Sequence, residues 1–212
     1  MCCMVSVSKL GVTIKNKEIV KDISFEVQKG EIFGLIGGNG SGKTVIMKCI
    51  SGLFPYTEGE IKIDGKMIGK DLDYPEELGL MIETPQFVGG ISGYKNLSML
   101  TCYRRKISKK DILNVLREVG LDCNLRLPVK KYSLGMRQRL GIAQAIMENP
   151  KILILDEPFN SLDDDAVTWF RSWLIEYKNR GNIVILSSHN KDDINFLCDK
   201  VITLKKGKIL LT

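Results

Sequence analysis

A glycine-rich phosphate-binding pattern is the strongest chemical signal in the sequence. It fits G-x-x-x-x-G-K-[ST] and consists of Gly37, Gly38, Asn39, Gly40, Ser41, Gly42, Lys43 and Thr44. Between a strand and a helix, such a turn directs several backbone N–H groups at one point, where the helix dipole adds partial positive charge. Lys43 supplies a full charge for the outer phosphates, and the Thr44 hydroxyl suits Mg²⁺. A glycine turn that binds nothing is the alternative, but it gives no reason for Lys43 and Thr44 to follow Gly42.

Two adjacent carboxylates follow a short apolar run at residues 152–155. A strand end in an open α/β sheet places side chains beside the ligand crevice. Asp156 is therefore predicted to hold Mg²⁺ through its water shell, and Glu157 to accept a proton from, or orient, an attacking water. Two acids that merely start a turn before Pro158 are the alternative, which the upstream phosphate pattern makes the weaker one.

Two further positions could also meet a phosphate. His189, the only histidine, follows a second apolar run at residues 183–186, where it could hydrogen-bond a γ-phosphate and the attacking water. A surface or satisfied core histidine is the alternative. Ser133 and Gly135 begin a predicted helix, so the Ser133 hydroxyl, the Gly135 N–H and the helix N-terminus could form a second anion site. An ordinary capped helix explains the same residues.

The elements that must position these residues follow an α/β pattern. The first third is rich in predicted strands, with an edge strand at residues 5–8 and a hairpin that turns at Asp64-Gly65. A helical insertion is predicted from about residue 92 to residue 149. Strands at 152–155 and 183–186, a helix after Asp163 and a final hairpin at Lys206-Gly207 complete the chain. This alternation predicts a mostly parallel sheet with an antiparallel edge.

Composition places the chain among ordinary globular proteins. It has 212 residues, 44% hydrophobic and 26% charged, which fits one domain over residues 1–212. No apolar run approaches the roughly 20 residues that cross a bilayer, and the N-terminus lacks signal-peptide features, so we expect a cytosolic chain whose membrane role needs a partner. The net charge of +6 is mild and comes without a long basic block, so no nucleic-acid partner is expected. The six scattered cysteines are predicted to be reduced thiols.

The order of the motifs resembles that of the ATP-binding-cassette ATPases. The resemblance covers nearly the whole chain and rests on the phosphate loop, Ser133 and Gly135, Asp156 and Glu157, Ser161-Leu162-Asp163, and His189. It implies a P-loop NTPase core with a helical subdomain, ATP and Mg²⁺ as ligands, and a head-to-tail homodimer. In such a dimer Ser133 and Gly135 would bind the ATP of the other subunit, Asp163 would lie between the two sites, and Glu157 and His189 would serve hydrolysis.

Three departures from the family pattern refine this expectation. The usual Leu-Ser-Gly-Gly-Gln reads Tyr132-Ser133-Leu134-Gly135-Met136 here. Glu83 aligns with the family's metal-linked glutamine, although Gln86 lies nearby. Ile14 aligns with the aromatic residue that usually stacks on adenine. The sequences around Glu83 and Ser133 resemble those of the subgroup that exports bacitracin, lantibiotics and related peptides.

The resemblance therefore implies a Mg-dependent ATPase subunit that powers peptide export through a separate transmembrane permease subunit, at the cytoplasmic face of the membrane. The helical insertion and the adjoining loop over residues 85–91, with its apolar Phe87, are predicted to contact that partner. Soluble cassettes that act on ribosomes or DNA tend to be longer than 212 residues. A regulator that hydrolyses ATP poorly would need neither Glu157 nor His189. A small-molecule P-loop kinase shares only the first motif.

Overall fold

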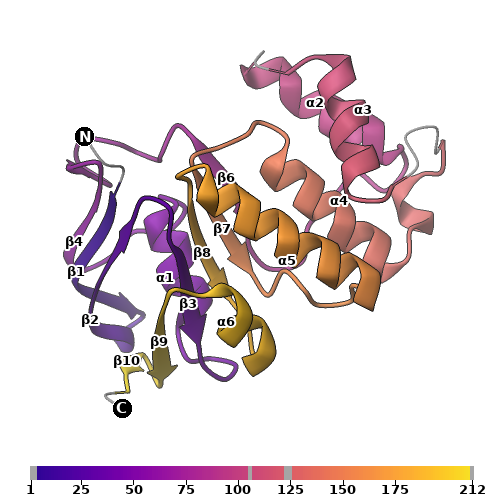
Figure 1. Cartoon of the computed structure of the whole chain (residues 1–212). Helices are drawn as coiled ribbons and strands as arrows, with labels where there is room; N and C mark the ends of the chain where they lie inside the picture. Colours follow the sequence, from indigo (N-terminus) through magenta and orange to yellow (C-terminus); the bar gives the residue numbers. More distant parts are fainter. Residues whose placement is uncertain (1–3, 105–106, 122–125, 211–212) are drawn as a thin grey trace.

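The computed structural model describes residues 4–104, 107–121 and 126–210, and the strands in these residues form two sheets (Figure 1). The smaller sheet is antiparallel, with the order β2-β1-β4-β5. Its strands are β1 (Met4–Ile14), β2 (Lys17–Gln28), β4 (Glu58–Ile63) and β5 (Lys66–Met67). The predicted hairpin is confirmed between β4 and β5, where Asp64 and Gly65 have the positive φ angles, 51° and 80°, that a tight two-residue turn requires.

The larger sheet has the order β10-β9-β3-β8-β7-β6 and is parallel except for β10 at its edge. Its strands are β3 (Ile32–Ile36), β6 (Leu78–Met81), β7 (Ile152–Asp156), β8 (Ile183–Ser187), β9 (Lys200–Lys205) and β10 (Lys208–Ile209). The predicted α/β fold, with a mostly parallel sheet and an antiparallel edge, is confirmed. The other antiparallel strands form the separate smaller sheet.

The prediction of an edge strand at residues 5–8 is wrong. Strand β1 lies between β2 and β4, and Val5 pairs with Val27 on one side and Ile63 on the other. The alternation of apolar and polar residues reports that one face of a strand is buried. It carries no information on how many neighbouring strands pair with it.

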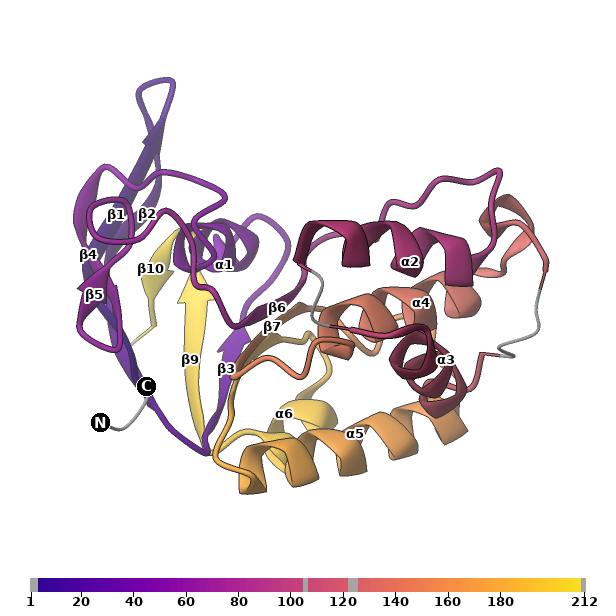
Figure 2. The same cartoon turned by 90° about the horizontal axis from the view of Figure 1, so that it is seen from above.

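Helices cover both faces of the parallel sheet (Figures 1 and 2). Helix α1 (Lys43–Ile50) lies between the two sheets and contacts β2 and β7. Helices α5 (Asp164–Asn179) and α6 (Lys191–Leu197) lie on the opposite face. Side chains of β7 alternate between the two cores: Ile152 and Ile154 pack on the α1 side, and Leu153 and Leu155 on the α5 side. Burial on both faces explains why these strands are continuous apolar runs.

The region from residue 92 to residue 149 is helical, as predicted. It contains α2 (Gly93–Arg104), α3 (Lys109–Glu118), a short 3₁₀ turn (Val129–Lys131) and α4 (Leu134–Ile146). Helices α2 and α3 lie at the end of the molecule farthest from the antiparallel sheet (Figure 2), whereas α4 contacts β6 of the parallel sheet. The treatment of this region as a separate subdomain stays a prediction.

Two other predictions from the sequence can be compared with the structure. In the described part of the chain, no helix is both long and apolar enough to cross a membrane. Cys49 and Cys198 are free, and burial raises the pKa of each thiol to about 12, which keeps them protonated and unreactive at neutral pH. Cys2, Cys3, Cys123 and the side chain of Cys102 lie outside what the structure describes.

Candidate nucleotide site

The phosphate loop joins β3 to α1. Gly42 is the N-cap residue of α1, and its φ of 106° belongs to a region that side-chain-bearing residues rarely adopt. No side chain caps this helix, so its first N–H groups stay available to an anion. The hydroxyl of Ser41 is buried and has no hydrogen-bond partner among the described residues. An uncapped helix start beside an unpaired buried hydroxyl fits a bound phosphate group.

Lys43 places its ammonium group over this loop. The side chain is only 8% exposed, and its Nζ donates a hydrogen bond to the Gly37 carbonyl at 2.7 Å. The same Nζ lies 3.8 Å from Oε1 of Glu157. One cation therefore lies between the phosphate loop and the carboxylate at the end of β7.

Asp156 connects three elements of the site. Its Oδ2 accepts a hydrogen bond from the Thr44 hydroxyl at 2.6 Å, and its Oδ1 accepts one from the Ser187 hydroxyl at 2.6 Å. Asp156 is 7% exposed. The Ser187 hydroxyl also accepts a hydrogen bond from the backbone N–H of Glu157 at 2.9 Å. The ends of α1, β7 and β8 are thus tied together around one carboxylate.

Glu157 and His189 contact each other directly. Oε2 of Glu157 lies 2.8 Å from Nδ1 of His189 and 3.3 Å from its backbone nitrogen. Glu157 has a φ of 50°, which is uncommon for a residue with a side chain and often occurs at functional sites. The Gln138 amide donates hydrogen bonds to the Glu157 and Pro158 carbonyls, which supports this turn from α4.

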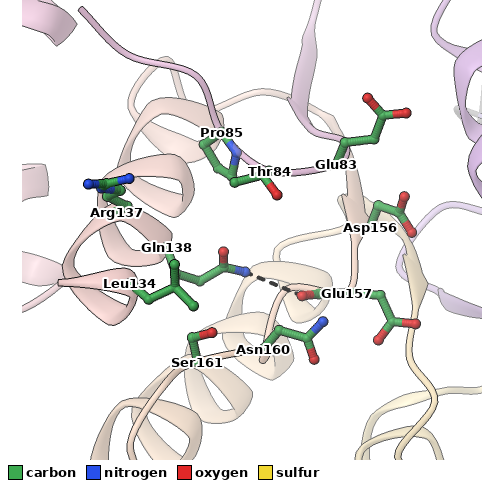
Figure 3. A pocket seen from close by; sticks show the side chains of 10 residues that line it. All are labelled: Glu83, Thr84, Pro85, Leu134, Arg137, Gln138, Asp156, Glu157, Asn160 and Ser161. Atoms are coloured by element: carbon green, nitrogen blue, oxygen red, sulfur yellow. Dashed lines mark hydrogen bonds between the residues drawn. The ribbon is translucent and has the colours of Figure 1, made fainter. Parts of the chain in front are cut away.

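A pocket of about 350 Å³ opens beside these carboxylates (Figure 3). Asp156, Glu157 and Glu83 lie on one side, and residues from the start of α4 and the loop before α5 lie on the other. Within the described residues, no three His, Cys, Asp or Glu side chains form a group that could hold a metal ion. A Mg²⁺ site here would therefore need water and phosphate oxygens, which suits an ion that takes only one or two carboxylates at nucleotide sites.

Glu83 shares this pocket, whereas Gln86 does not. The Glu83 carboxylate, 63% exposed, forms an ion pair with Lys48 of α1 at 2.6 Å. Gln86 lies in a neighbouring groove, and its amide donates to the Thr84 carbonyl at 3.3 Å. Of the two candidates, Glu83 is therefore nearer to the predicted metal position.

Ser133, Gly135 and Asp163 lie at two neighbouring helix starts. Ser133 caps α4 by accepting a hydrogen bond from the Met136 N–H at 3.1 Å. Gly135 packs so closely that an added Cβ would come within 2.7 Å of the Ser161 carbonyl oxygen. In the described part of the chain, Ser133, Gly135 and Asp163 form no hydrogen bond to residues 37–44, the phosphate loop of the same subunit.

Asp163 caps α5 and holds it to α4. It accepts a hydrogen bond from the Ala166 N–H at 2.9 Å. Both of its carboxylate oxygens also accept hydrogen bonds from the Arg139 guanidinium. The Ala166 N–H and then Arg139 lower the pKa of Asp163.

Far from these residues in sequence, Ile14 ends β1, pairs with Lys17 and packs against the core on the α1 side.

The model of the ABC transporter family matches residues 20–160. This span contains the phosphate loop, the start of α4 and both carboxylates at the end of β7. The chain belongs to the ABC transporter family. It is an ATP-binding subunit of that family, and the resemblance inferred from the motif order is confirmed. ATP-binding domains of ABC transporters are ATPases, which agrees with the chemistry of the site.

Relatives of this ABC subunit are similar over most of its length. The uncharacterized ABC transporter ATP-binding protein YybJ of Bacillus subtilis is 41% identical over 206 residues, which cover 97% of this chain and 94% of YybJ. The lantibiotic transport ATP-binding protein SrtF of Streptococcus pyogenes is 35% identical, and the match covers 98% of this chain and 90% of SrtF. The bacitracin transport ATP-binding protein BcrA of Enterococcus faecalis is 38% identical, and the match covers 91% of this chain and 63% of BcrA.

Solved structures of ABC cassettes have the same fold. The cassette cbiO1 from Clostridium perfringens, part of the ABC transporter complex cbiONQ, has a TM-score of 0.80 and 26% identity over 100% of this chain and 88% of cbiO1. The dimeric cassette MJ0796 with ADP and Pi has a TM-score of 0.87 over 98% of this chain and 97% of MJ0796. Its identity of 21% supports the fold alone.

Proposed function

We propose that this chain hydrolyses Mg·ATP as a head-to-tail homodimer and powers the export of peptides or antimicrobial compounds through a separate transmembrane permease at the cytoplasmic face of the membrane. The main support is the convergence of Lys43, Thr44, Asp156, Glu157 and His189 at the ends of three neighbouring elements. SrtF and BcrA, which are named for lantibiotic and bacitracin transport, support the kind of cargo.

The first group of residues binds the nucleotide. In this proposal the backbone N–H groups of residues 37–44, the Ser41 hydroxyl and Lys43 hold the phosphates. Thr44 and Asp156, whose oxygens are already paired at 2.6 Å, hold Mg²⁺. The ion, when bound, neutralises charge on the phosphate oxygens. Ile14 contacts the adenine ring by apolar packing in place of aromatic stacking.

The second group acts on water. Glu157 accepts the proton of the water that attacks the γ-phosphate, while Lys43 binds the outer phosphates. His189 bonds the Glu157 carboxylate through Nδ1, so it fixes the direction in which Glu157 faces the water. The positive φ of Glu157 is consistent with a side chain held in one working position.

The third group comes from the partner subunit. In the proposed dimer, Ser133 and Gly135 face the ATP bound by the other copy, and Asp163 lies between the two sites. Leu134, which stands between Ser133 and Gly135, is 64% exposed, so this helix start is free to meet another surface. MJ0796, which shares the fold, provides a precedent for a dimeric cassette.

Replacement of Glu83 by Gln should preserve ATP hydrolysis but raise the Mg²⁺ concentration needed for half-maximal rate. The carboxylate attracts the ion more strongly than an amide does, and it also repels nearby phosphate oxygens. The measurement is ATPase rate against Mg²⁺ concentration at saturating ATP. Lys48→Gln is a matched control, because it breaks the Lys48–Glu83 ion pair but keeps the carboxylate. A large change in Gln86→Ala with none in Glu83→Gln would overturn the assignment of the metal-linked position.

The permease is proposed to dock beside the loop over residues 85–91. A groove of about 340 Å³ lies there between α4 and the segment after β6, and its lining includes Leu53, which is 63% exposed. Phe87 was the apolar residue expected to meet the partner, but it is partly buried and packs against the core. Val88 is 54% exposed and is the better candidate. The cassette cbiO1, as part of cbiONQ, is an example of a cassette within a transporter complex.

Val88→Asp should reduce co-purification with the permease and the permease-dependent stimulation of ATPase activity, while basal hydrolysis persists. The backbone of Val88 bonds the Asn96 side chain, so replacement of the exposed side chain leaves the loop in place. Tyr74→Asp is the matched control, since Tyr74 is 56% exposed and lies outside the loop over residues 85–91. Equal loss of permease binding in both variants, or in neither, would contradict this docking position.

A further inference from the structure

A buried acidic residue that the proposed chemistry does not use lies behind His189. Asp193 of α6 is 2% exposed. Its Oδ1 accepts hydrogen bonds from Nε of Arg171 at 3.0 Å and from Nη2 of the same guanidinium. Its Oδ2 accepts a hydrogen bond from the Ser188 hydroxyl at 3.2 Å. A buried carboxylate is costly unless it is paired and hydrogen-bonded, and both oxygens of Asp193 have partners.

This network reaches the loop that carries His189. The Ser188 hydroxyl, while donating to Asp193, accepts a hydrogen bond from the backbone N–H of Asn190 at 3.1 Å. It therefore spans His189 and fixes the backbone on both sides of it. The preceding serine, Ser187, is tied to the opposite side of the site through Asp156 and the Glu157 N–H. Two consecutive serines thus connect the His189 loop to different elements.

Packing alone does not hold His189 in place. Its side chain is 68% exposed, and a cavity of about 400 Å³ opens beside it, lined in part by Arg171, Ser188 and Asn190. With open space on one side, the position of the loop depends on its hydrogen bonds. Arg171 also lies 5.5 Å from the ring centroid of Phe196, so α5 holds α6 at a second point.

We propose that Arg171, Asp193 and Ser188 form a positioning network that holds His189 against Glu157 during ATP hydrolysis. The inference rests on the proposed function, in which His189 orients the Glu157 carboxylate. The three residues act through His189 and do not touch the reacting atoms. Loss of the network lets the His189 loop drift from Glu157, which slows the hydrolytic step but leaves the phosphate loop and its affinity for ATP intact.

The test is a double-mutant cycle with steady-state ATPase kinetics on the full chain. Arg171→Gln and, as a milder change, Ser188→Ala are each measured alone and together with His189→Ala. Arg171→Gln should lower kcat by between about 10- and 100-fold, the scale expected when a reacting group is misplaced by about an ångström. The KM for ATP should stay unchanged. In the His189→Ala background, either change should cause no further loss, because both act through the same group.

Matched controls separate positioning from general weakening of α5. Arg180→Gln removes another arginine of this region, which pairs with the exposed Glu176 at 3.6 Å. Ser172→Ala removes a hydroxyl that donates a hydrogen bond to the Thr168 carbonyl in its own helix. Both should retain the parental kcat. Thermal unfolding of every variant sets a temperature at which all are folded. Where Arg171→Gln does not fold, the test rests on Ser188→Ala.

Each result has a distinct meaning. Parental kcat in the Ser188 and Arg171 variants, or losses that add fully to that of His189→Ala, would overturn the positioning network and leave the proposed function intact. A parental kcat in His189→Ala would instead show that the proposed role of His189 is wrong, and the positioning network would be rejected with it. Non-additive loss of kcat with unchanged KM supports both.

Discussion

Replacement of Glu157 by Gln should lower ATPase turnover by between about 10²- and 10⁴-fold, the usual contribution of a positioned acid–base group. The amide keeps the shape of the side chain but cannot accept the proton of the attacking water. In the structure the carboxylate lies 2.8 Å from His189 Nδ1 and 3.8 Å from Lys43 Nζ, between the group proposed to orient it and the group proposed to bind the phosphates. ATP binding should persist, and an ATP-bound dimer should accumulate, because the ATP proposed to lie between the two copies is no longer cleaved.

Steady-state ATPase rates, ATP affinity and the molecular mass in the presence of ATP measure the three parts of this prediction. Glu176→Gln is the matched control, since Glu176 is an exposed glutamate on α5 whose partner is Arg180. It should retain parental turnover and show no added dimer. Hydrolysis at the parental rate by Glu157→Gln would show that another group activates the water.

Lys43→Ala should weaken ATP binding itself by about 10- to 100-fold, the range for loss of a hydrogen bond to a charged group. The ammonium is nearly buried and is held by the Gly37 carbonyl, so it is aimed in advance at the outer phosphates. Equilibrium titration with a fluorescent ATP analogue measures the affinity. Lys62→Ala, which removes an exposed lysine of β4 paired with Glu60, should bind as the parent does. Unchanged affinity in Lys43→Ala would contradict a phosphate-binding role.

The two variants together separate binding from hydrolysis. Lys43→Ala should lose affinity, whereas Glu157→Gln should keep affinity and lose turnover. This difference follows from geometry, because Lys43 belongs to the phosphate loop after β3 and Glu157 follows β7, which is separated from β3 by β8. A loss of affinity of the same size in both would indicate that Glu157 supports the nucleotide site and not the water.

Much of the site could be predicted from the sequence because its residues stand next to strong local signals. The phosphate loop has a fixed spacing, and Asp156 and His189 each follow an apolar run that became a central strand. Parallel strands bring their carboxyl ends to one edge of a sheet, so residues far apart in the chain could be expected to meet there. The helix starts at Ser133 and Asp163 could also be predicted, since each needs only a local cap.

Contacts between distant side chains could not be predicted in this way. Gln138 bonds the carbonyls after β7, and Arg171 reaches Asp193 from another helix, without a spacing pattern that marks either contact. The same limit explains the errors. Alternation in β1 revealed its buried face but not its two neighbouring strands. The apolar Phe87 in a glycine-containing loop was expected to contact the partner, but it is partly buried against the core.

The central claim is that this ATPase works on a separate membrane protein, and its most direct test is to identify what binds the native chain in membranes of its source. The tagged chain is purified from detergent-solubilised membranes with ATP, and the recovered proteins are identified and quantified, with Val88→Asp as the paired variant. We expect an integral membrane protein in fixed ratio to the chain, recovered less well with Val88→Asp and able to stimulate hydrolysis by the native chain. Recovery of ribosomal proteins or DNA, or of no integral membrane protein, would contradict the account and favour a soluble cassette.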